Sequence, residues 1–183
     1  FAETFGSASN RMLAGKLGLV SLDREGDDAL LGELFKLLEA VETDVTLFYR
    51  GLAAVPVDEA ATDSALIDPR TRAFYAEDAR APEYRGRLAG WLRRYGARVR
   101  QDGVPVPERV ERMNRVNPKY VLRNYLAQQA IDALAGGDAS VMERLMVVLQ
   151  RPYDEQPGHD ELADRRPEWA RHKPGCSALS CSS

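Results

Sequence analysis

The sequence predicts an all-α protein that ends in an irregular polar segment. Apolar residues recur at steps of three and four along most of the first 150 residues, which is the period of one helix face. No stretch of any length alternates apolar and polar residues as a strand does. From Arg151 onwards the chain is polar and contains several prolines. We expect this segment to be extended or irregular and to pack along a surface through Tyr153 and Trp169.

Composition narrows the class of protein. The chain is 44% hydrophobic and 29% charged, as in ordinary globular proteins, and its 25 basic and 28 acidic residues nearly balance. This balance provides no overall field for nucleic acid, and no apolar run reaches the roughly 20 residues that cross a bilayer. Two cysteines cannot form a secreted disulfide framework. We therefore predict a cytoplasmic protein with no nucleic-acid or membrane partner.

The first strong helical pattern covers residues 27–52. Asp27 and Asp28 suit the first turn, where carboxylates interact with the positive end of the helix dipole, and Pro56 ends the pattern. The apolar stripe consists of Leu30, Leu31, Leu34, Leu37, Leu38, Val41, Val45, Phe48 and Leu52. We expect one continuous helix with this stripe in the core. The chain starts at Phe1 and not at Met, so we also expect it to be a piece of a longer protein.

The middle of the chain divides into a connection and a helix. Residues 54–82 are rich in Ala, Asp and Pro with weak periodicity, which predicts a long connection with one short helical turn. Residues 83–101 resume the helical period, and Gly103 and Pro105 end it. The expected inward face of this helix consists of Leu88, Trp91, Leu92, Tyr95 and Val99.

Two further helices are predicted before the polar segment. Asn117 can cap the first, with Pro118 at its first helical position, and Gly136 and Gly137 can end it. Its expected inward residues are Val121, Leu122, Tyr125, Leu126, Ala130, Ala133 and Leu134. Asp138 can cap the second, which covers residues 139–150 and stops before Pro152.

Motifs for nucleotide or nucleophile chemistry are absent from the sequence. Neither phosphate-loop pattern occurs, and residues 15–19 (GKLGL) lack the spacing, so we interpret them as an ordinary helix end. There is no GxSxG turn. The carboxylate pairs at residues 42 and 44 and at residues 58 and 59 suggest solvated surface. His172, Cys176 and Cys181 could together hold zinc, but a fourth ligand is not evident and a solvated histidine is the simpler interpretation.

Arginines concentrate in residues 85–100. They are Arg85, Arg87, Arg93, Arg94, Arg98 and Arg100. Such a run can contact phosphate or an acidic partner, but a salt-bridged helix face accounts for it more simply. The alternative function to an enzyme is therefore a free-standing helical interaction module whose arginine face (Arg93, Arg94, Arg98) binds an acidic partner.

Both cysteines lie among the last eight residues. Cys176 and Cys181 stand beside glycine and serines, where we expect no core to bury them. Structural cysteines are usually buried and inert, whereas exposed thiols near a chain end can reach other sulfurs. We predict a redox or cross-linking role for Cys181 and Cys176, and no catalytic or metal-binding residue elsewhere in the chain.

Several blocks, in one order, resemble the C-terminal region of the selenoprotein O family, also called the YdiU family. The blocks are RMLAGKLGL, DDALLGELFKLLE, YRGRLAGWLRRY, VNPKYVLRNYLAQQAIDAL, VLQRPYDEQ, RRPEWA and LSCSS. The resemblance implies a protein-kinase-like fold whose members bind ATP with Mg²⁺ or Mn²⁺ in a flipped orientation. It also implies transfer of AMP to Ser, Thr or Tyr hydroxyls of protein substrates in the bacterial cytoplasm.

The resemblance carries no catalytic residue into this chain. The metal-binding Asp, the catalytic-loop Asn and the ATP-clamping Lys–Glu pair are expected before Phe1. Residues 1–150 would then be a helical region that packs on an absent kinase-like core, with residues 151–183 as an extended tail. We expect this chain alone to bind no ATP or metal and to be inactive.

In the family, the third residue from the end is selenocysteine or cysteine, and Cys181 stands there. The resemblance implies that this residue pairs with a cysteine of the core, which makes activity redox-dependent. Some members have another cysteine three residues earlier, where this chain has Ala178. A local bridge between Cys176 and Cys181 therefore departs from the family spacing, and the thiol partner stays open.

Overall fold

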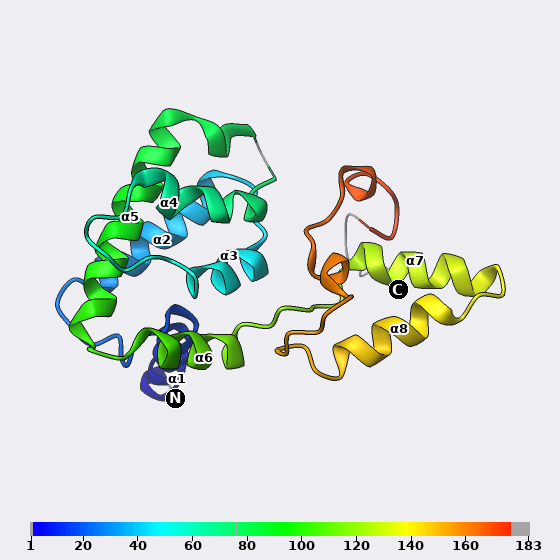
Figure 1. Cartoon of the computed structure of the whole chain (residues 1–183), viewed down its shortest axis with the longest axis horizontal. Coiled ribbons are helices and arrows are strands. Elements are labelled where there is room, and N and C mark those ends of the chain that lie inside the picture. The colour runs from blue at the N-terminus through cyan, green and yellow to red at the C-terminus, as the bar shows by residue number, and fades with distance from the viewer. Residues whose placement is uncertain (1, 76, 177–183) are drawn as a thin grey trace. The chain divides into compact units, whose positions relative to one another are not determined.

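The computed structural model describes residues 2–75 and 77–176, and over these residues the chain contains helices and turns without a strand. The predicted all-α class is confirmed for this part of the chain. The chain divides into two compact units, Phe1–Asn117 and Pro118–Ser183 (Figure 1). The unit boundary lies at residue 117, whereas the sequence suggested a division at residue 150. None of the described helices is long and apolar enough to cross a membrane.

The first unit contains six α-helices and two 3-10 segments among its described residues. In chain order they are α1 (Ala2–Leu17), α2 (Asp27–Ala40), α3 (Val45–Leu52), α4 (Asp63–Ile67), η1 (Asp68–Ala73), η2 (Glu77–Arg80), α5 (Pro82–Gln101) and α6 (Val106–Val116). The second unit contains α7 (Asn124–Ala135), α8 (Ser140–Leu149), η3 (Asp160–Ala163) and η4 (Glu168–Ala170).

Helix α5 forms the centre of the first core. It packs against α2 and α4, and all five residues expected on its inward face are buried. The Trp91 ring stacks on Tyr95 with centroids 5.3 Å apart, and Trp91 Nε1 donates to the carbonyl of Leu30 at 2.9 Å. The Tyr95 hydroxyl donates to the carbonyl of Leu17 at 2.7 Å. The two rings therefore join α5 to α2 and to the end of α1.

The expected single helix over residues 27–52 is wrong, because the chain forms two helices there. Helix α2 ends at Ala40, and α3 begins after Asp44, whose carboxylate accepts a hydrogen bond from the Leu47 N–H at 3.0 Å. The Asp44 N–H donates to the carbonyl of Ala73 at 2.7 Å. The helix is interrupted because Asp44 makes a good N-cap and pairs with residues far along the chain. The apolar stripe remains mostly buried, although Val45 is exposed.

Residues 54–82 are more structured than expected. They contain α4, η1 and η2, and they bury Leu66, Ile67 and Phe74 in the first core. The Thr62 side chain caps α4 by accepting from the Ala65 N–H. Each piece is too short to show helical periodicity, which explains why composition suggested a connection.

Residues 104–123 also differ from expectation. Helix α6 was not predicted from the sequence, and it buries Arg109 and Met113. Asn117 follows α6 and does not begin the next helix: its side-chain amide donates to the carbonyl of Lys16 at 2.9 Å. Helix α7 begins seven residues later at Asn124. The expected inward residue Leu122 is consequently exposed.

Helices α7 and α8 form the hairpin that holds the second core. Tyr125, Leu126 and Ala130 of α7 pack with Leu145 and Val148 of α8. As predicted, α7 ends at Gly136 and Gly137, where Gly137 has a φ of 87°. The Asp138 carboxylate accepts from the Ser140 N–H at 2.9 Å, at the start of α8. Leu134, expected inside, is exposed.

Candidate functional site

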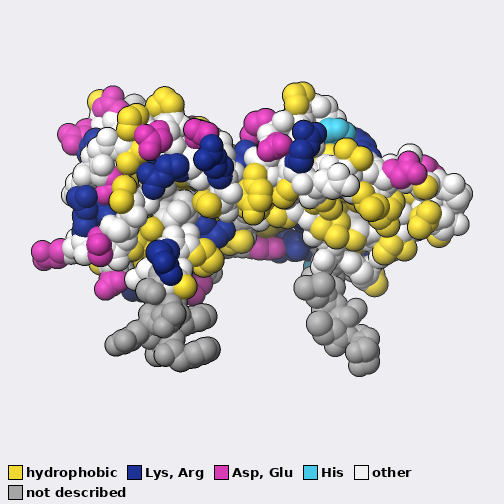
Figure 2. Space-filling view, turned by 90° about the horizontal axis from the view of Figure 1, so that it is seen from below, with side chains coloured by type: hydrophobic (Ala, Val, Ile, Leu, Met, Phe, Trp, Pro, Cys, Tyr) yellow, Lys and Arg dark blue, Asp and Glu magenta, His cyan; other side chains and the backbone are white. Residues whose placement is uncertain are grey.

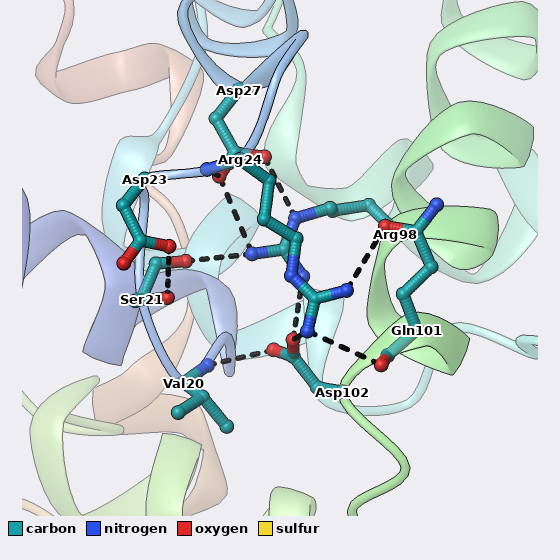
Figure 3. Close-up of polar contacts among 8 residues, drawn as sticks. All are labelled: Val20, Ser21, Asp23, Arg24, Asp27, Arg98, Gln101 and Asp102. Atoms are coloured by element: carbon teal, nitrogen blue, oxygen red, sulfur yellow. Dashed lines mark hydrogen bonds and ion pairs between the residues drawn. The ribbon is translucent and has the colours of Figure 1, made fainter.

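A buried charge network lies where the chain between α1 and α2 meets the end of α5 (Figure 3). Arg98 is at its centre. Its Nε donates to Asp27 at 2.7 Å, one terminal nitrogen donates to Asp102 at 2.7 Å, and the other donates to the carbonyl of Ser21 at 2.8 Å. The side chains of Arg98, Asp27 and Asp102 are each less than a tenth exposed. Three segments distant in sequence are thereby held by one guanidinium.

The surrounding groups complete the network. The Arg24 N–H donates to Asp27 at 3.0 Å, and the Arg24 guanidinium lies 3.0 Å from Asp102. The Val20 N–H donates to Asp102 at 2.8 Å. Burial raises the pKa of Asp27, but the hydrogen bonds from Arg98 and from the Arg24 N–H outweigh this, so its pKa is lowered. A carboxylate that stays ionised between arginines is a poor proton donor, and we interpret the network as structural.

The arginine run is mostly neutralised within the chain, as the salt-bridged interpretation predicted. Arg85 pairs with Asp68 at 2.8 Å, Arg93 with Asp63 at 2.5 Å, and Arg100 with Glu59 at 2.7 Å; Arg94 pairs with Glu33. Figure 2 shows basic and acidic side chains intermixed over the first unit on the face it presents. The alternative of an acidic partner on Arg93, Arg94 and Arg98 loses support, since each has a carboxylate already.

Two arginines, Arg70 and Arg109, are buried although no pattern in the sequence predicted it. Arg109 donates to the carbonyl of Ala53 at 3.1 Å and to the Tyr95 hydroxyl at 3.3 Å, and Arg70 donates to the carbonyl of Leu66. Each arginine donates to a carbonyl group at the C-terminus of a helix, Arg109 at α3 and Arg70 at α4. Cations are favoured at this end of a helix. Burial lowers the pKa of Arg70 to about 10. The only available signal was the spacing of Arg109 and Met113 on one face of α6.

The acidic pairs also differ from one another. Glu42, Asp58 and Glu59 are exposed, as expected for solvated surface. Asp44 is buried, and the expectation of solvated surface is wrong for it. It caps α3, and the Tyr75 hydroxyl donates to its second oxygen at 3.2 Å. An acid that begins a helix cannot be separated from a surface acid by composition alone.

The glycine-containing segment at residues 15–19 is an ordinary helix end, as expected. The Gly18 N–H donates to the carbonyl of Gly15 at 3.1 Å, and Gly18 has a φ of 68°. A Cβ on Gly18 would lie 2.5 Å from the sulfur of Met113. Glycine is therefore required here by the turn and by the close approach of α6, without any phosphate.

Cys176 contradicts the expectation that no core buries the terminal cysteines. It is 4% exposed and belongs to the second core, and its N–H donates to the carbonyl of Lys173 at 3.0 Å. A tight turn places the thiol against the apolar residues of α7, α8 and η3. The sequence beside it is polar, so local composition could not reveal this contact. Cys181 lies outside the described residues.

The segment before Cys176 is fixed to α7 by several contacts. Lys173 pairs with Asp132 at 2.9 Å, and this hydrogen bond raises the pKa of Lys173 and lowers that of Asp132. The Lys173 ammonium also lies 5.6 Å from the centroid of Trp169, whose ring meets Tyr125 edge to face. The expected packing through Trp169 is thus present, although the ring stays half exposed.

The histidines do not form a metal site in the described part of the chain. His159 accepts a hydrogen bond from Arg144 at 3.1 Å, and His172 is exposed. Over residues 2–75 and 77–176, no group of three His, Cys, Asp or Glu side chains is placed to hold a metal ion. The zinc alternative requires Cys181, which lies outside these residues.

These features define a helical region whose charged clusters stabilise the fold. The model of the family described as "Protein adenylyltransferase SelO" matches residues 1–150, and the chain belongs to this family. Three relatives are named "Protein nucleotidyltransferase YdiU". The proteins of Nitrosospira multiformis, Rhodopirellula baltica and Aromatoleum aromaticum are 54%, 48% and 44% identical, and all of this chain aligns with each. The chain spans only 34–36% of the length of these relatives.

The described residues offer no set of ligands that fits a divalent metal. The sequence has no phosphate loop, and the described residues have no cluster of ligating side chains. Asp27 and Asp102, the buried carboxylates nearest to each other in the network, are already neutralised by Arg98. We therefore assign neither ATP nor a metal ion to residues 2–75 and 77–176.

Proposed function

We propose that this chain is the helical C-terminal region of an enzyme that transfers AMP from ATP to Ser, Thr or Tyr hydroxyls of protein substrates. One observation carries the proposal: the whole chain aligns with proteins named protein nucleotidyltransferase at up to 54% identity. In such a transfer the hydroxyl group gives up its proton to a base, and its oxygen bonds to the α-phosphorus. The bond between the α-phosphorus and the oxygen that bridges to the β-phosphate breaks, and pyrophosphate leaves.

The role of this chain within that enzyme is support. Its two cores are apolar, and its buried charges stabilise helix ends and join segments distant in sequence, which supports a structural role for this chain. We propose that a kinase-like core holds ATP with Mg²⁺ or Mn²⁺, that the helices pack on this core, and that the chain alone is inactive. The bacterial relatives and the scarcity of cysteine support a cytoplasmic location.

We further propose that Cys181 makes the enzyme responsive to redox conditions. Two thiols joining in a disulfide lose two electrons and two protons to an oxidant such as glutathione disulfide. The burial of Cys176 in the second core favours Cys181 as the responding thiol, because a shielded thiol reacts slowly. The partner sulfur would then belong to the kinase-like core.

The test of the transfer reaction uses the full-length protein that contains these residues. It is incubated with protein substrates and with ATP labelled at either the α- or the γ-phosphate. We expect protein-bound label from the α-position only. Label from the γ-position would indicate a kinase, and no label with either would overturn the proposal. The 183-residue chain, tested alongside, should transfer neither.

The redox proposal has its own test in the same protein. Activity is measured with and without a thiol reductant for the unchanged enzyme and for Cys181→Ser. We expect the variant to be equally active in both conditions. Ser182→Ala is the matched control beside it and should keep the reductant dependence. A Cys181→Ser enzyme that still responds to reductant would exclude this thiol as the switch.

A further inference from the structure

A groove between α2 and α5 has no role in the proposed function. It has a volume of about 520 Å³. Its lining comes from one face of each helix: Glu33, Lys36, Leu37, Gly86, Arg87, Gly90, Trp91 and Arg94. Leu37 and Trp91 form the floor of the groove, and both side chains are almost fully buried. The accessible lining is therefore formed mainly by charged side chains and by the two glycines.

Two glycines make the room in this groove. Gly86 and Gly90 lie four residues apart within the 20-residue helix α5, so they share one face. A Cβ at Gly86 would meet nothing within 4 Å, and one at Gly90 would meet only the end of the Arg94 side chain, at 3.8 Å. Packing within the described residues thus does not require glycine at either position. Glycine inside a helix is less stable than alanine, but it lets another backbone approach closely.

The positive charges that line the groove outnumber the negative charges. Lys36 and Arg87 form no ion pair with any described residue, whereas the other five arginines of residues 85–100 each have a carboxylate. Glu33 is the single acidic residue of the lining, and it is paired with Arg94. The groove therefore has two cations that lack counter-charges.

We propose that this groove binds an acidic segment of a protein. The backbone of that segment lies against α5 at Gly86 and Gly90, and its carboxylates pair with Lys36 and Arg87. A free phosphate would leave the space over Gly86 and Gly90 unused, and two cations are few for nucleic acid, whose binding depends on many phosphate contacts. This inference does not depend on the transfer reaction.

The test uses the full-length protein that contains these residues and a labelled 16-residue peptide composed of Glu, Ala and Leu. Its charge-reversed counterpart, with Lys in place of Glu, is the second probe. Fluorescence anisotropy should show binding of the acidic peptide only, weakening as salt is raised. Each ion pair lost at an exposed site weakens binding by about two- to fivefold. The double variant Lys36→Glu/Arg87→Glu should therefore lose at least this much, and Gly90→Leu should also weaken binding by filling the groove.

A matched variant separates the groove from overall charge. Arg80→Glu/Arg115→Glu makes the same change in net charge at exposed sites outside the lining, and it should bind as the unchanged chain does. Equal losses in both double variants would overturn the proposal, as would no binding up to about 1 mM peptide. Competition by inorganic phosphate or by an oligonucleotide at equal charge would overturn it too. If circular dichroism shows that Gly90→Leu is unfolded, the two charge variants alone test the proposal.

Discussion

Arg98 of α5 and Asp27 of α2 are 71 residues apart in sequence, yet Arg98 Nε lies 2.7 Å from the Asp27 carboxylate and both side chains are buried. Asp27 stands in the first turn of α2, as its place in the sequence suggested, but its carboxylate serves mainly the arginine and the Arg24 N–H. The pair fixes the chain between α1 and α2 against the end of α5. It is a structural contact that no local pattern indicates.

Asp27→Asn should destabilise the chain strongly. The amide keeps the shape of the side chain but leaves the Arg98 guanidinium with one carboxylate, Asp102, in a buried site. Breaking a buried pair by removing one partner costs about 3–5 kcal/mol. Urea unfolding followed by circular dichroism measures the change. Glu33→Gln removes the exposed partner of Arg94 and should cost less than about 1 kcal/mol. A loss at Asp27 no larger than at Glu33 would contradict the structural role of the network.

The same carboxylate predicts how stability depends on pH. The pKa of Asp27 is lower in the folded chain than in the unfolded chain, where it is about 3.9. The folded state therefore binds fewer protons than the unfolded state. The stabilisation that ionised Asp27 provides is present above about pH 3.9, and it is lost as the pH falls through the pKa of Asp27 in the folded chain. The free energy of unfolding, measured from pH 6 to pH 2, should fall less steeply for Asp27→Asn than for the unchanged chain. Identical slopes would show that Asp27 has an ordinary pKa.

Tyr95→Phe tests the hydroxyl that joins α5 to α1. Its loss leaves the buried carbonyl of Leu17 without this donor and removes the acceptor of one Arg109 hydrogen bond, which should cost about 1–3 kcal/mol. Burial raises the pKa of Tyr95 to about 12. The folded state therefore holds the proton longer than the unfolded one, and stability should decline as the pH rises from about 10 to 12. This decline, measured by urea unfolding, should be weaker in the phenylalanine variant.

The sequence predicted the class of fold and the helices whose apolar stripes are long. Residues 83–101 show five inward positions in one pattern, and all five are buried. The pattern at residues 27–52 was equally clear, but periodicity cannot report that Asp44 caps a new helix while its N–H pairs with Ala73. Pro118 led to a predicted helix start that is too early. The Asn117 side chain donates to the carbonyl of Lys16, and α7 begins only at Asn124.

The site residues were harder to predict than the helices, for a physical reason. Burial of Cys176 depends on a turn and on α7, which ends 41 residues upstream, and polar neighbours such as His172 and Lys173 conceal this burial in the sequence. Arg98 belonged to a run that suggested a charged surface, and only the fold shows that it turns inward while Arg87 does not. In both cases burial depends on contacts with residues that are distant in the sequence, and a single sequence does not show such contacts.

Gly175→Ala should expose the thiol of Cys176. Gly175 has a φ of 81°, which is unfavourable for alanine by about 1–2 kcal/mol, and its Cβ would lie 2.3 Å from the Gln128 side chain. Gln128 can swing aside, but the strained turn should open more often. In a Cys181→Ser background Cys176 is the single thiol, and its alkylation by iodoacetamide is followed by mass spectrometry. The rate should rise by about tenfold relative to the same background with Gly175.

Gly158→Ala provides the matched control for that experiment. Gly158 has a similar φ of 85°, but a Cβ there would meet nothing within 4 Å, and it lies in another turn. This variant carries the same backbone strain, and the alkylation rate of Cys176 should stay near that of the background. Equal acceleration in both variants would mean that Cys176 reacts through opening of the whole unit. Fast alkylation with Gly175 intact would show that the thiol is not protected by its turn on α7.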